Sequence, residues 1–452
     1  MKLLLDKMKR IEVDKLNYDY LFDHILPFIP EQINYKEFLP EITDPNDYAR
    51  TILLLNPIEL VLIHWPPGVE SAIHLHAGFW GYVGVLEGEA TNVEYELNDG
   101  VLQLKRSVRV KEGGLIPEPD GIIHKINNAS TEEALVTLHY YYPPLKDLDG
   151  LRLFSTDGTM VELNEKAKSA SLHLEADCYR SFKRGQFSFE NDAIGKSHIL
   201  SPIIPKPKSK EIKKMILSYY SRQAINYDND DIEDEKRRKY VFAINDILVE
   251  EFKKIKPTNV LDIASGTGRR ALRIKSQSGL DYHISGVDMN QEMCELSTKR
   301  GITSYCEDWI TLDLPNNSFD VITMLYAFGH VPDALERILF LEKVHEKLKP
   351  GGVFYFDVFN INDPYEWGSR ALSIFNEYKL DFFGYEKGDV FYKRSGMDEV
   401  SFLHYFEEER LVALLESLGF KCEKVFHIGY VYKSGQLVNK EEGKLFIKAV
   451  KI

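Results

Sequence analysis

Cysteine is scarce in this chain, and long apolar runs are absent from it. Only 4 of its 452 residues are cysteine, and Cys178, Cys294, Cys306 and Cys422 include no C-x-x-C pair, so neither a disulfide framework nor a zinc knuckle is indicated. The opening MKLLLDKMKR carries charges where a signal peptide needs an unbroken apolar core, and no run approaches the length of a membrane span. We therefore expect a soluble protein in a reducing, cytoplasmic setting, with no membrane partner.

Positive charge is also in short supply. Lys and Arg number 56 against 70 Asp and Glu, which gives a formal net charge of −14. This balance argues against a nucleic-acid partner and against an anionic membrane surface, because both attract basic proteins. The hydrophobic fraction of 44% is ordinary for a globular protein. A chain of this length is too long for one core, so two domains of about 200 residues each are expected.

The pattern of apolar residues changes near residue 200. From about 51 to 142 the chain alternates in short runs separated by Gly, Pro, Asn and Asp, which is typical of antiparallel strands in a barrel or jelly roll. Residues 201–214 are rich in Pro and Lys and are predicted to form a linker without regular structure. The rest alternates strands, a glycine-rich turn and helices, which indicates a parallel sheet covered by helices. We therefore predict an all-β barrel domain over 1–200 and an α/β, Rossmann-like domain over 215–452.

Three histidines in the strand-rich half have surroundings that suit metal binding. His74 and His76 are two apart in an apolar run, and residues at i and i+2 of a strand project to the same face. His124 follows in a similar setting. A lone histidine on an apolar strand is usually a hydrogen-bonded core residue, but three converging neutral imidazoles form a site for a divalent first-row metal.

The spacing around these histidines resembles the two motifs of the cupin family. The stretch from Gly68 to Gly88 resembles the first motif, and the stretch from Gly113 to Asn128 resembles the second. The usual cupin has a glutamate where this chain has Gly81, so one carboxylate ligand is expected to be missing. Three neutral ligands would leave the metal dipositive with about three free positions, which favours an anionic, chelating substrate together with O2.

Residues 48–144 resemble cysteine dioxygenase, the thiol dioxygenase branch of the cupins. The segments that carry the resemblance are Tyr48-Ala49-Arg50, Trp65-Pro66-Pro67-Gly68, His124-Lys125-Ile126-Asn127-Asn128 and Thr137-Leu138-His139-Tyr140-Tyr141-Tyr142-Pro143-Pro144. The resemblance implies Fe(II) held by His74, His76 and His124, with O2 as co-substrate. It implies that cysteine, or a similar small thiol, is oxidised to its sulfinate.

The same resemblance implies roles for residues around the metal. Arg50 would bind the substrate carboxylate, with Tyr48 and Trp65 also at the substrate, although a strand-surface charge is the plainer interpretation of an arginine. Tyr141 would donate a hydrogen bond to the reacting oxygen, and His139 would orient Tyr141. The animal enzymes have a cysteine, cross-linked to the tyrosine, where this chain has Gly81, so no thioether cofactor is expected.

A glycine-rich turn marks the second half of the chain. An apolar strand runs into Ala264-Ser265-Gly266-Thr267-Gly268 and a helix follows, an arrangement that lets a ligand approach the backbone. Asp288 ends the next apolar strand, where a carboxylate can bind ribose hydroxyls. The glycines alone also fit a nicotinamide cofactor, since Ala271 is a permitted variant of the third glycine. Asp262 favours S-adenosylmethionine, because an acid there suits the cationic end of that cofactor.

From Asp262 to Phe356 the chain resembles the class I S-adenosylmethionine-dependent methyltransferases. The implied cofactor-binding residues, the last two from an N-terminal lid, are Asp262, Ser265, Gly266, Gly268, Asp288, Met289, Asp308, Trp309, Tyr219 and Tyr227. The methyl acceptor stays unknown. Two alternatives are open for Tyr326 and His330, which either pack in the core or contact the substrate. The aromatic stretch 375–391 either covers the acceptor or belongs to the core.

The two resemblances together imply a bifunctional enzyme that oxidises a small thiol and methylates a small molecule, in either order. The amine, the sulfinate product and a separate metabolite are all open as acceptors. Methylation before oxidation is compatible only with N- or O-methylation, because S-methylation would remove the thiolate that iron needs. The alternative is a methyltransferase regulated by a non-catalytic, metal-binding cupin. Arg50, His139 and Tyr141 favour the enzyme, since a sensor needs no carboxylate clamp.

Overall fold

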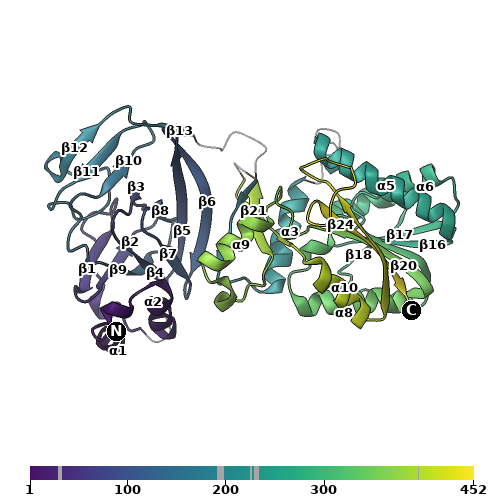
Figure 1. Cartoon of the computed structure of the whole chain (residues 1–452), viewed down its shortest axis with the longest axis horizontal. Helices are drawn as coiled ribbons and strands as arrows, with labels where there is room; N and C mark the ends of the chain where they lie inside the picture. Colours follow the sequence, from purple (N-terminus) through teal and green to yellow (C-terminus); the bar gives the residue numbers. More distant parts are fainter. Residues whose placement is uncertain (29–32, 191–197, 224–226, 229–233, 395–396) are drawn as a thin grey trace. The chain divides into compact units, whose positions relative to one another are not determined.

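The computed structural model describes residues 1–28, 33–190, 198–223, 227–228, 234–394 and 397–452 (Figure 1). The chain divides into two compact units, and each unit gathers segments that are distant in the sequence. The first unit comprises Met1–Pro207, Phe375–Tyr385 and Tyr392–Asp398, and the second comprises Lys208–Ile374, Glu386–Phe391 and Glu399–Ile452. Two segments from the C-terminal half of the sequence therefore belong to the first unit. The two units are thus not separated at a single linker, unlike the two domains predicted from the sequence.

The first unit is built on two largely antiparallel sheets (Figure 1). One sheet has, in spatial order, β1 (Ala49–Leu54), β2 (Glu59–Trp65), β9 (Leu135–Tyr142), β4 (Trp80–Glu87) and β7 (Leu115–Glu118). The other has β12 (Tyr179–Lys183), β11 (Met160–Leu163), β10 (Arg152–Phe154), β3 (Ile73–Leu75), β8 (Ile123–Asn128), β5 (Glu89–Asn98), β6 (Val101–Lys111) and β13 (Ser188–Glu190). This all-β architecture confirms the predicted fold class of the N-terminal half.

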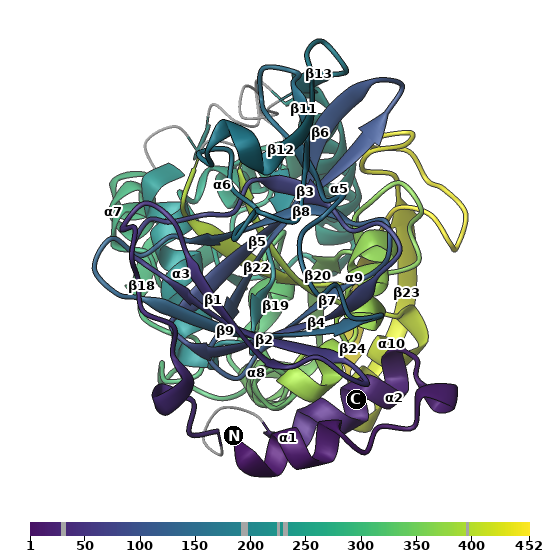
Figure 2. The ribbon, with the colours of Figure 1, turned by 90° about the vertical axis from the view of Figure 1, so that its left-hand side faces the viewer.

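Short helical elements and two further strands complete the first unit. They are α1 (Lys2–Met8), η1 (Val13–Lys15), α2 (Tyr18–Ile25), η2 (Leu26–Phe28), η4 (Lys36–Phe38), η5 (Ala176–Cys178), β14 (His198–Leu200) and β15 (Ile203–Ile204). Figure 2 shows α1 and α2 beside the sheet that contains β2, β9 and β4. Tyr18 on α2 packs against Trp80 and Tyr82 of β4, with ring centroids 4.6 and 5.4 Å away. The helices therefore cover this sheet with aromatic side chains.

The second unit contains a sheet of the order β18 (Thr303–Cys306), β17 (His283–Asp288), β16 (Asn259–Ile263), β19 (Phe319–Met324), β20 (Leu348–Val358), β24 (Lys444–Lys451) and β23 (Phe420–Ile428). The first five strands pair in parallel, and β24 is antiparallel to both of its neighbours. The other elements of the C-terminal half of the sequence, some of which fall in the first unit, are α3 (Ser209–Gln223), α5 (Glu235–Ile255), α6 (Arg269–Ser278), α7 (Gln291–Lys299), η6 (Phe328–His330), α8 (Ala334–Lys347), α9 (Gly368–Glu377), η7 (Leu380–Phe383), β21 (Asp389–Arg394), β22 (Val400–His404) and α10 (Glu408–Ser417).

Both faces of the parallel sheet are buried. Successive residues of a strand enter different cores, as Val260 and Leu261 do on β16 and Val321 and Ile322 do on β19. Because both faces of such strands are buried, the sequences of parallel strands covered by helices are continuous apolar runs. The α/β, Rossmann-like fold class predicted for the C-terminal half is confirmed. Among the residues that the structure describes, no helix is long and apolar enough to cross a membrane.

The prediction that residues 201–214 lack regular structure is wrong. Ile203 and Ile204 form β15, which pairs in parallel with β6 between Pro202 and Pro205. A proline removes only its own N–H, so the residues between two prolines can still pair with the edge of a sheet. Helix α3 begins at Ser209, just after the last of these prolines, where a residue without an N–H costs the helix nothing.

Of the two expectations for the aromatic stretch 375–391, the structure favours a core position for residues 375–385, in the first unit rather than the second. Its residues 375–385 pack with the first unit. Tyr378 is buried there, and the Tyr385 hydroxyl accepts from the Ile203 N–H at 2.9 Å and lies 2.7 Å from the Ile203 carbonyl, to which it donates. The segment therefore forms part of the core of the barrel unit.

Gly81 on β4 lies where a side chain would collide with the neighbouring strand. A Cβ at this position would lie 1.7 Å from the carbonyl oxygen of Tyr140 and 3.1 Å from Cδ1 of Tyr141, both on β9. Residues 81 and 141 are register partners, so β4 and β9 are in direct contact there. A glutamate therefore cannot occupy this position without moving β4 away from β9.

We predict that Gly81→Ala lowers the free energy of unfolding by roughly 1–3 kcal/mol or more, because the new methyl group forces two paired strands apart. Urea unfolding followed by circular dichroism measures the loss. Gly84→Ala on the same strand is the matched control, since its Cβ would be 3.3 Å from the movable Leu115 side chain. Equal stabilities of the two variants would contradict this account of Gly81.

Candidate functional site

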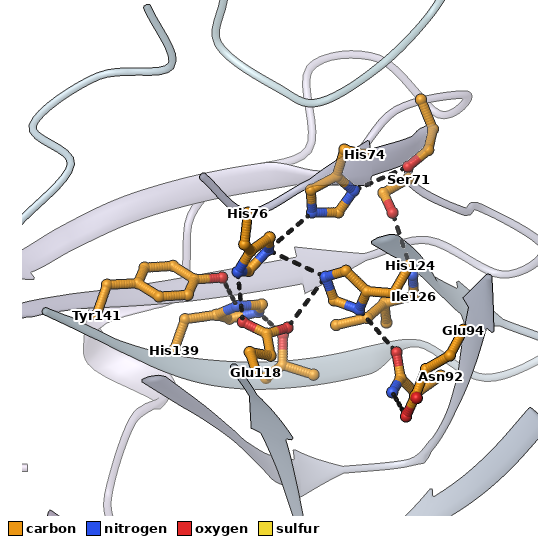
Figure 3. Close-up of polar contacts among 12 residues, drawn as sticks. Ser71, His74, His76, Asn92, Glu94, Glu118, His124, Ile126, His139 and Tyr141 are labelled. Carbon is orange, nitrogen blue, oxygen red and sulfur yellow. Dashed lines mark hydrogen bonds and ion pairs between the residues drawn. The ribbon is translucent and has the colours of Figure 1, made fainter. Parts of the chain in front are cut away.

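Three histidine side chains converge inside the first unit (Figure 3). His74 on β3 is the register partner of His124 on β8, and His76 follows two residues after His74. The Nε2 atom of His76 lies 3.2 Å from Nε2 of His74 and 3.0 Å from Nε2 of His124. Three ring nitrogens facing one another at these distances are arranged as donors to one metal ion.

The hydrogen bonds of two of these rings fix their tautomers. His74 Nδ1 donates to the Ala72 carbonyl at 2.9 Å, and His124 Nδ1 donates to the Asn92 side-chain oxygen at 2.8 Å. Each Nε2 then carries a lone pair toward the common point. Burial lowers the pKa of His74 to about 4 and lowers the pKa values of His76 and His124 as well. The rings are therefore neutral near pH 7, which is the form that binds a cation.

A buried polar network holds Asn92 in place behind His124. The Asn92 Nδ2 group donates to the Tyr378 hydroxyl at 3.1 Å, and the Tyr378 hydroxyl donates to Glu94 Oε1 at 2.6 Å. Arg106 forms an ion pair with Glu94 Oε2 at 2.7 Å. Because the amide nitrogen points at Tyr378, the amide oxygen points at His124. The ligand set is thus oriented by a residue from the C-terminal half of the sequence, and nothing around Tyr378 in the sequence signals this role.

The residues predicted to bind substrate line the same cavity as the histidines. The cavity lining includes Tyr48, Arg50, Trp65, His139 and Tyr141 together with His74, His76 and His124. Arg50 Nη2 lies 3.3 Å from Glu59 Oε1, and Glu59 is fully buried. Glu59 Oε2 accepts from the backbone N–H groups of Leu145 and Lys146 at 2.6 and 3.1 Å. Arg50 is therefore held at the cavity by an anchored carboxylate, and a guanidinium has five N–H donors, so it has donors left for an anionic ligand.

A chain of hydrogen bonds runs from Trp65 on β2 to the Tyr141 hydroxyl on the neighbouring strand β9. Trp65 Nε1 donates to the Thr137 hydroxyl at 2.8 Å, and that hydroxyl lies 2.9 Å from His139 Nε2. His139 Nδ1 lies 2.7 Å from the Tyr141 hydroxyl. Burial lowers the pKa of His139 to about 3, so the ring has one proton. With Thr137 donating to Nε2, His139 donates to Tyr141, and the phenol proton of Tyr141 is left for the Glu118 carboxyl group, with which Tyr141 forms a hydrogen bond.

A carboxylate that the sequence interpretation missed stands beside the three histidines. Glu118 on β7 is fully buried, its Oε1 atom is 3.4 Å from His124 Nε2, and its Oε2 atom is 3.9 Å from His76 Nδ1 (Figure 3). Glu118 is the register partner of Gly81 across β4 and β7. Gly81 itself supplies no carboxylate, and the carboxyl group beside the histidines comes from the strand opposite Gly81. Only the pairing of β7 with β4 reveals that Glu118 lies at this site, and that pairing cannot be seen in the sequence.

Most of the predicted cofactor residues line a cavity in the second unit. Gly266, Asp288, Met289, Asp308, Trp309 and Tyr227 line it, and an adjoining cavity is lined by Asp262 and Ser265 together with Gly266 and Tyr227. Two of the predicted residues line neither cavity. Tyr219 is buried, and its neighbour Tyr220 lines the first cavity in its place. Gly268 is the N-cap of α6 with φ of 73°, and a Cβ there would lie 2.7 Å from the Ser297 hydroxyl.

The turn after β16 and the end of β17 are tied together by backbone hydrogen bonds. Asp288 Oδ2 accepts from the Gly266 N–H at 2.8 Å, and Asp288 Oδ1 accepts from the Asn290 N–H at 2.9 Å. Asp262 Oδ1 accepts from the Thr323 hydroxyl at 2.6 Å, and burial raises the pKa of Asp262 to about 6. Two carboxylates thus stand at the carboxyl ends of neighbouring parallel strands, where ligands of open α/β sheets bind.

Tyr326 and His330, whose roles were left open, both line the cavity after β19. His330 Nδ1 donates to the Phe402 carbonyl at 2.6 Å, and His330 Nε2 accepts from the Tyr220 hydroxyl at 2.8 Å. Burial lowers the pKa of His330 to about 4, so this ring is neutral. The lining of this cavity is therefore aromatic and uncharged at Tyr220, Tyr326 and His330.

Comparisons with known proteins match these two halves separately. Residues 31–154 match the family model for cysteine dioxygenase type I, and residues 260–352 match that for a methyltransferase domain. The chain is 32% identical over 106 residues to a ubiquinone/menaquinone biosynthesis C-methyltransferase UbiE of Bradyrhizobium sp., covering 22% of this chain and 41% of that protein. It is 25% identical over 193 residues to a demethylmenaquinone methyltransferase of Listeria monocytogenes, covering 40% of this chain and 75% of the relative.

The solved structures similar to this chain include methyltransferases. One is a SAM-dependent methyltransferase of Methanosarcina mazei, with a TM-score of 0.34, 25% identity, and coverage of 43% of this chain and 92% of that one. Another is the 1,6-didemethyltoxoflavin-N1-methyltransferase of Burkholderia thailandensis, with a TM-score of 0.40, 18% identity, and coverage of 57% and 97%. The all-β barrel unit thus contains the segment that matches the cysteine dioxygenase type I model, and the Rossmann-like unit contains the segment that matches the methyltransferase model.

We predict that Asn92→Ala lowers the affinity of the protein for Co(II) by about ten- to a hundredfold, because His124 loses the partner that orients its ring. Competition with a chromophoric chelator measures the affinity. Gln103→Ala on the adjacent strand β6 is the control, since that amide donates to Glu96 rather than to a histidine. Unchanged affinity in Asn92→Ala would contradict the orienting role of Asn92.

Proposed function

We propose that the N-terminal domain is an Fe(II)-dependent dioxygenase that oxidises cysteine, or a close relative of cysteine, to its sulfinate. The observation that carries this proposal is that the three histidines, Arg50 and Tyr141 line one cavity. In the reaction RSH + O2 → RSO2H, two S–O bonds form, the O–O bond breaks, and the thiol proton ends on the sulfinic acid. Sulfur is oxidised and both oxygen atoms are reduced, so no further co-reactant is needed.

Iron bound by His74, His76 and His124 would supply a site for the thiolate and the activation of O2. The remaining tasks belong to side chains of the cavity. Arg50 binds the carboxylate of an amino-acid thiol, because a planar guanidinium pairs with a carboxylate through two hydrogen bonds. Its anchor Glu59 limits the positions that Arg50 can take. A thiol without a carboxylate would lose this contact, so Arg50 favours thiols with an acidic group.

Tyr141 serves as a hydrogen-bond donor to oxygen at the reacting sulfur. Burial raises the pKa of Tyr141 well above its usual value, so the phenol keeps its proton. The bond from His139 Nδ1 holds the Tyr141 oxygen in place. Gly81 offers no thiol for a cross-link, so Tyr141 acts as a free phenol.

We propose further that the C-terminal domain binds S-adenosylmethionine and methylates a small molecule. Asp288 would accept from the ribose hydroxyls, Asp262 would lie near the cationic end, and Asp308 and Trp309 would lie near the adenine. Methyl transfer to a positioned nucleophile needs orientation and desolvation more than a general base. Tyr220, Tyr326 and His330 line the cavity and would enclose the acceptor.

The fusion of the two domains favours consecutive steps on one small molecule. The sulfinate formed by the first domain, or a compound made from it, is the acceptor that we propose for the second. Because thiol S-methylation would block the first reaction, the oxidation comes first if sulfur or its oxygen is methylated. The amine and a separate metabolite are the other acceptors that the experiment below distinguishes.

Aerobic incubation of the full-length Fe(II)-loaded protein with cysteine and S-adenosylmethionine tests both activities. Mass spectrometry is expected to show a product with two added oxygen atoms, and a methyl group where that product is the acceptor. His74→Ala should abolish the oxygen addition and leave S-adenosylmethionine binding intact. Arg50→Lys should raise KM for cysteine by about tenfold or more, with a smaller change in kcat, because lysine cannot bind a carboxylate bidentately.

Arg180→Lys is the control for the arginine variant, since Arg180 is half-exposed on β12 and pairs with Asp149 and Glu162. Absence of O2 consumption across a panel of small thiols would contradict the dioxygenase proposal. That result would favour a metal-binding domain that regulates the methyltransferase without a reaction of its own.

We predict that the affinity for S-adenosylmethionine falls as the pH drops through about 6, the pKa to which burial raises Asp262. Below this pH the folded protein carries Asp262 as a neutral acid, which no longer attracts the cationic end of the cofactor. Calorimetric titrations between about pH 8 and pH 5 measure the effect. Asp262→Asn should remove this pH dependence, whereas the exposed-site control Asp281→Asn should keep it. A pH profile that is the same in all three proteins would show that Asp262 does not contact the cofactor.

A further inference from the structure

We infer that Glu118 is a positioning residue for Tyr141, whose phenol hydroxyl it holds across Gly81 and next to the three histidines. Glu118 then acts on the oxidation through Tyr141 and not through the metal. This role rests on the proposed function, in which Tyr141 donates a hydrogen bond at the reacting sulfur. The pairing of three strands, the packing of the phenol ring and the hydrogen bonds of its oxygen support it.

Glu118 and Tyr141 flank Gly81 from the two strands that pair with β4. Gly81 is the register partner of Glu118 on β7 and of Tyr141 on β9, and both pairings are antiparallel. Directly opposite residues direct their side chains to the same face of a sheet, so Glu118 and Tyr141 share a face. They are two strand spacings apart, about 10 Å, and the glycine between them has no side chain. Both side chains line the cavity of the histidines.

The phenol ring of Tyr141 packs over the position of the missing side chain. A Cβ at position 81 would lie 3.1 Å from Cδ1 of Tyr141. The rings of Phe79 and His76 pack edge-on against the phenol, with centroids 5.4 and 5.8 Å away. Figure 3 shows the Tyr141 hydroxyl pointing toward His76 and the Glu118 carboxyl group. The glycine therefore leaves the room in which the phenol reaches toward Glu118.

Two hydrogen bonds hold the phenol oxygen. It accepts from His139 Nδ1 at 2.7 Å, and its own proton goes to the Glu118 carboxyl group. The Glu118 oxygens lie 3.4 Å from Nε2 of His124 and 3.9 Å from Nδ1 of His76. The hydrogen bond to Glu118 therefore keeps the Tyr141 hydroxyl beside the histidines, where the thiol and O2 are proposed to react.

Burial makes the hydrogen bond between Glu118 and Tyr141 a strong constraint on the phenol. Both side chains are buried, Glu118 completely. In such an interior a polar group that loses its partner finds no water in its place, so both groups favour the position that keeps the bond. The phenol is thus held from its own strand by His139 and from β7 by Glu118, without a covalent bond to β4.

A double-mutant cycle on the full-length, Fe(II)-loaded protein with cysteine tests this role. Glu118→Leu is expected to lower kcat by about tenfold or more, with a smaller change in KM, because the phenol loses the group that orients it. Glu118→Gln keeps a hydrogen-bonding group and is expected to restore most of kcat. In a Tyr141→Phe background, Glu118→Leu should have no further effect, since Glu118 acts through the hydroxyl. Glu162→Leu is the control, because Glu162 lies on β11 and pairs with Arg180.

A measurement on the metal-free protein separates this role from the reaction. With 13C at the ζ carbon of tyrosine, the NMR resonance that is absent from Tyr141→Phe identifies Tyr141. This resonance is expected to shift in Glu118→Leu, because the phenol oxygen loses a hydrogen bond, and to stay in place in Glu162→Leu. An unshifted resonance in Glu118→Leu would overturn the role of Glu118.

Thermal unfolding shows whether the variants fold, and if Glu118→Leu does not, a crystal structure of the unmodified protein decides. The Tyr141 oxygen is then expected about 2.5–3.0 Å from a Glu118 oxygen, and a separation beyond about 3.5 Å would overturn the role. Wild-type kcat in Glu118→Leu, or the same loss of kcat in both backgrounds, would overturn it too. A wild-type protein that consumes no O2 with any thiol would instead overturn the proposed function, while the NMR shift would still report on Glu118.

Discussion

The pairing of β3 with β8 is the constraint on which the first domain depends. It sets His74 opposite His124, so that two ring nitrogens from distant parts of the chain face one point, and His76 adds a third. A slip of one residue would send the alternate side chains to the other face, and the set would be lost. Desolvation in this interior keeps the rings neutral, while the Nδ1 bonds to Ala72 and Asn92 fix their orientation.

The two units accommodate their buried polar side chains differently. In the first, three neutral imidazoles face a point that suits a cation, and Glu118 and Arg50 line the same cavity. In the second, Asp262 and Asp288 lie at the ends of parallel strands and are satisfied by hydroxyl and backbone donors. The histidine cluster of one sheet and the acid-lined turn of the other follow from which side chains the strands direct inward.

The sequence was a good guide where chemistry is local. The spacing of His74 and His76, the turn after Ile263 and the change of periodicity near residue 200 were enough to predict both fold classes. The candidate residues Arg50 and Tyr141 also line one cavity with the histidines. Each of these features depends on residues close in the chain or on a strand period that a reader can count.

Prediction from the sequence failed where the role of a residue depends on its neighbours in another strand or a distant segment. Glu118 matters because it faces Gly81, and Tyr378 matters because it reaches Asn92, a contact between residues 286 apart. Tyr219 and Tyr220 are neighbours on α3, and only Tyr220 lines the cavity. The resemblance to the methyltransferase lid did not show which of the two tyrosines would do so. Residues 201–214 were misjudged because their prolines suggested a linker, while the edge of β6 still offered Ile203 and Ile204 a pairing partner. Register and long-range packing, rather than composition, decide these positions.

The phenol of Tyr378 belongs to a first unit that is not one continuous stretch of the chain. A fragment that stops at residue 207 keeps every predicted ligand but loses the residues 375–385 that complete its core. In such a fragment Asn92 and Glu94 would face water or a void, and the orientation of His124 would no longer be imposed. The barrel is therefore a discontinuous unit, and its core is complete only after residues 375–385, which follow most of the second unit in the sequence, have been translated.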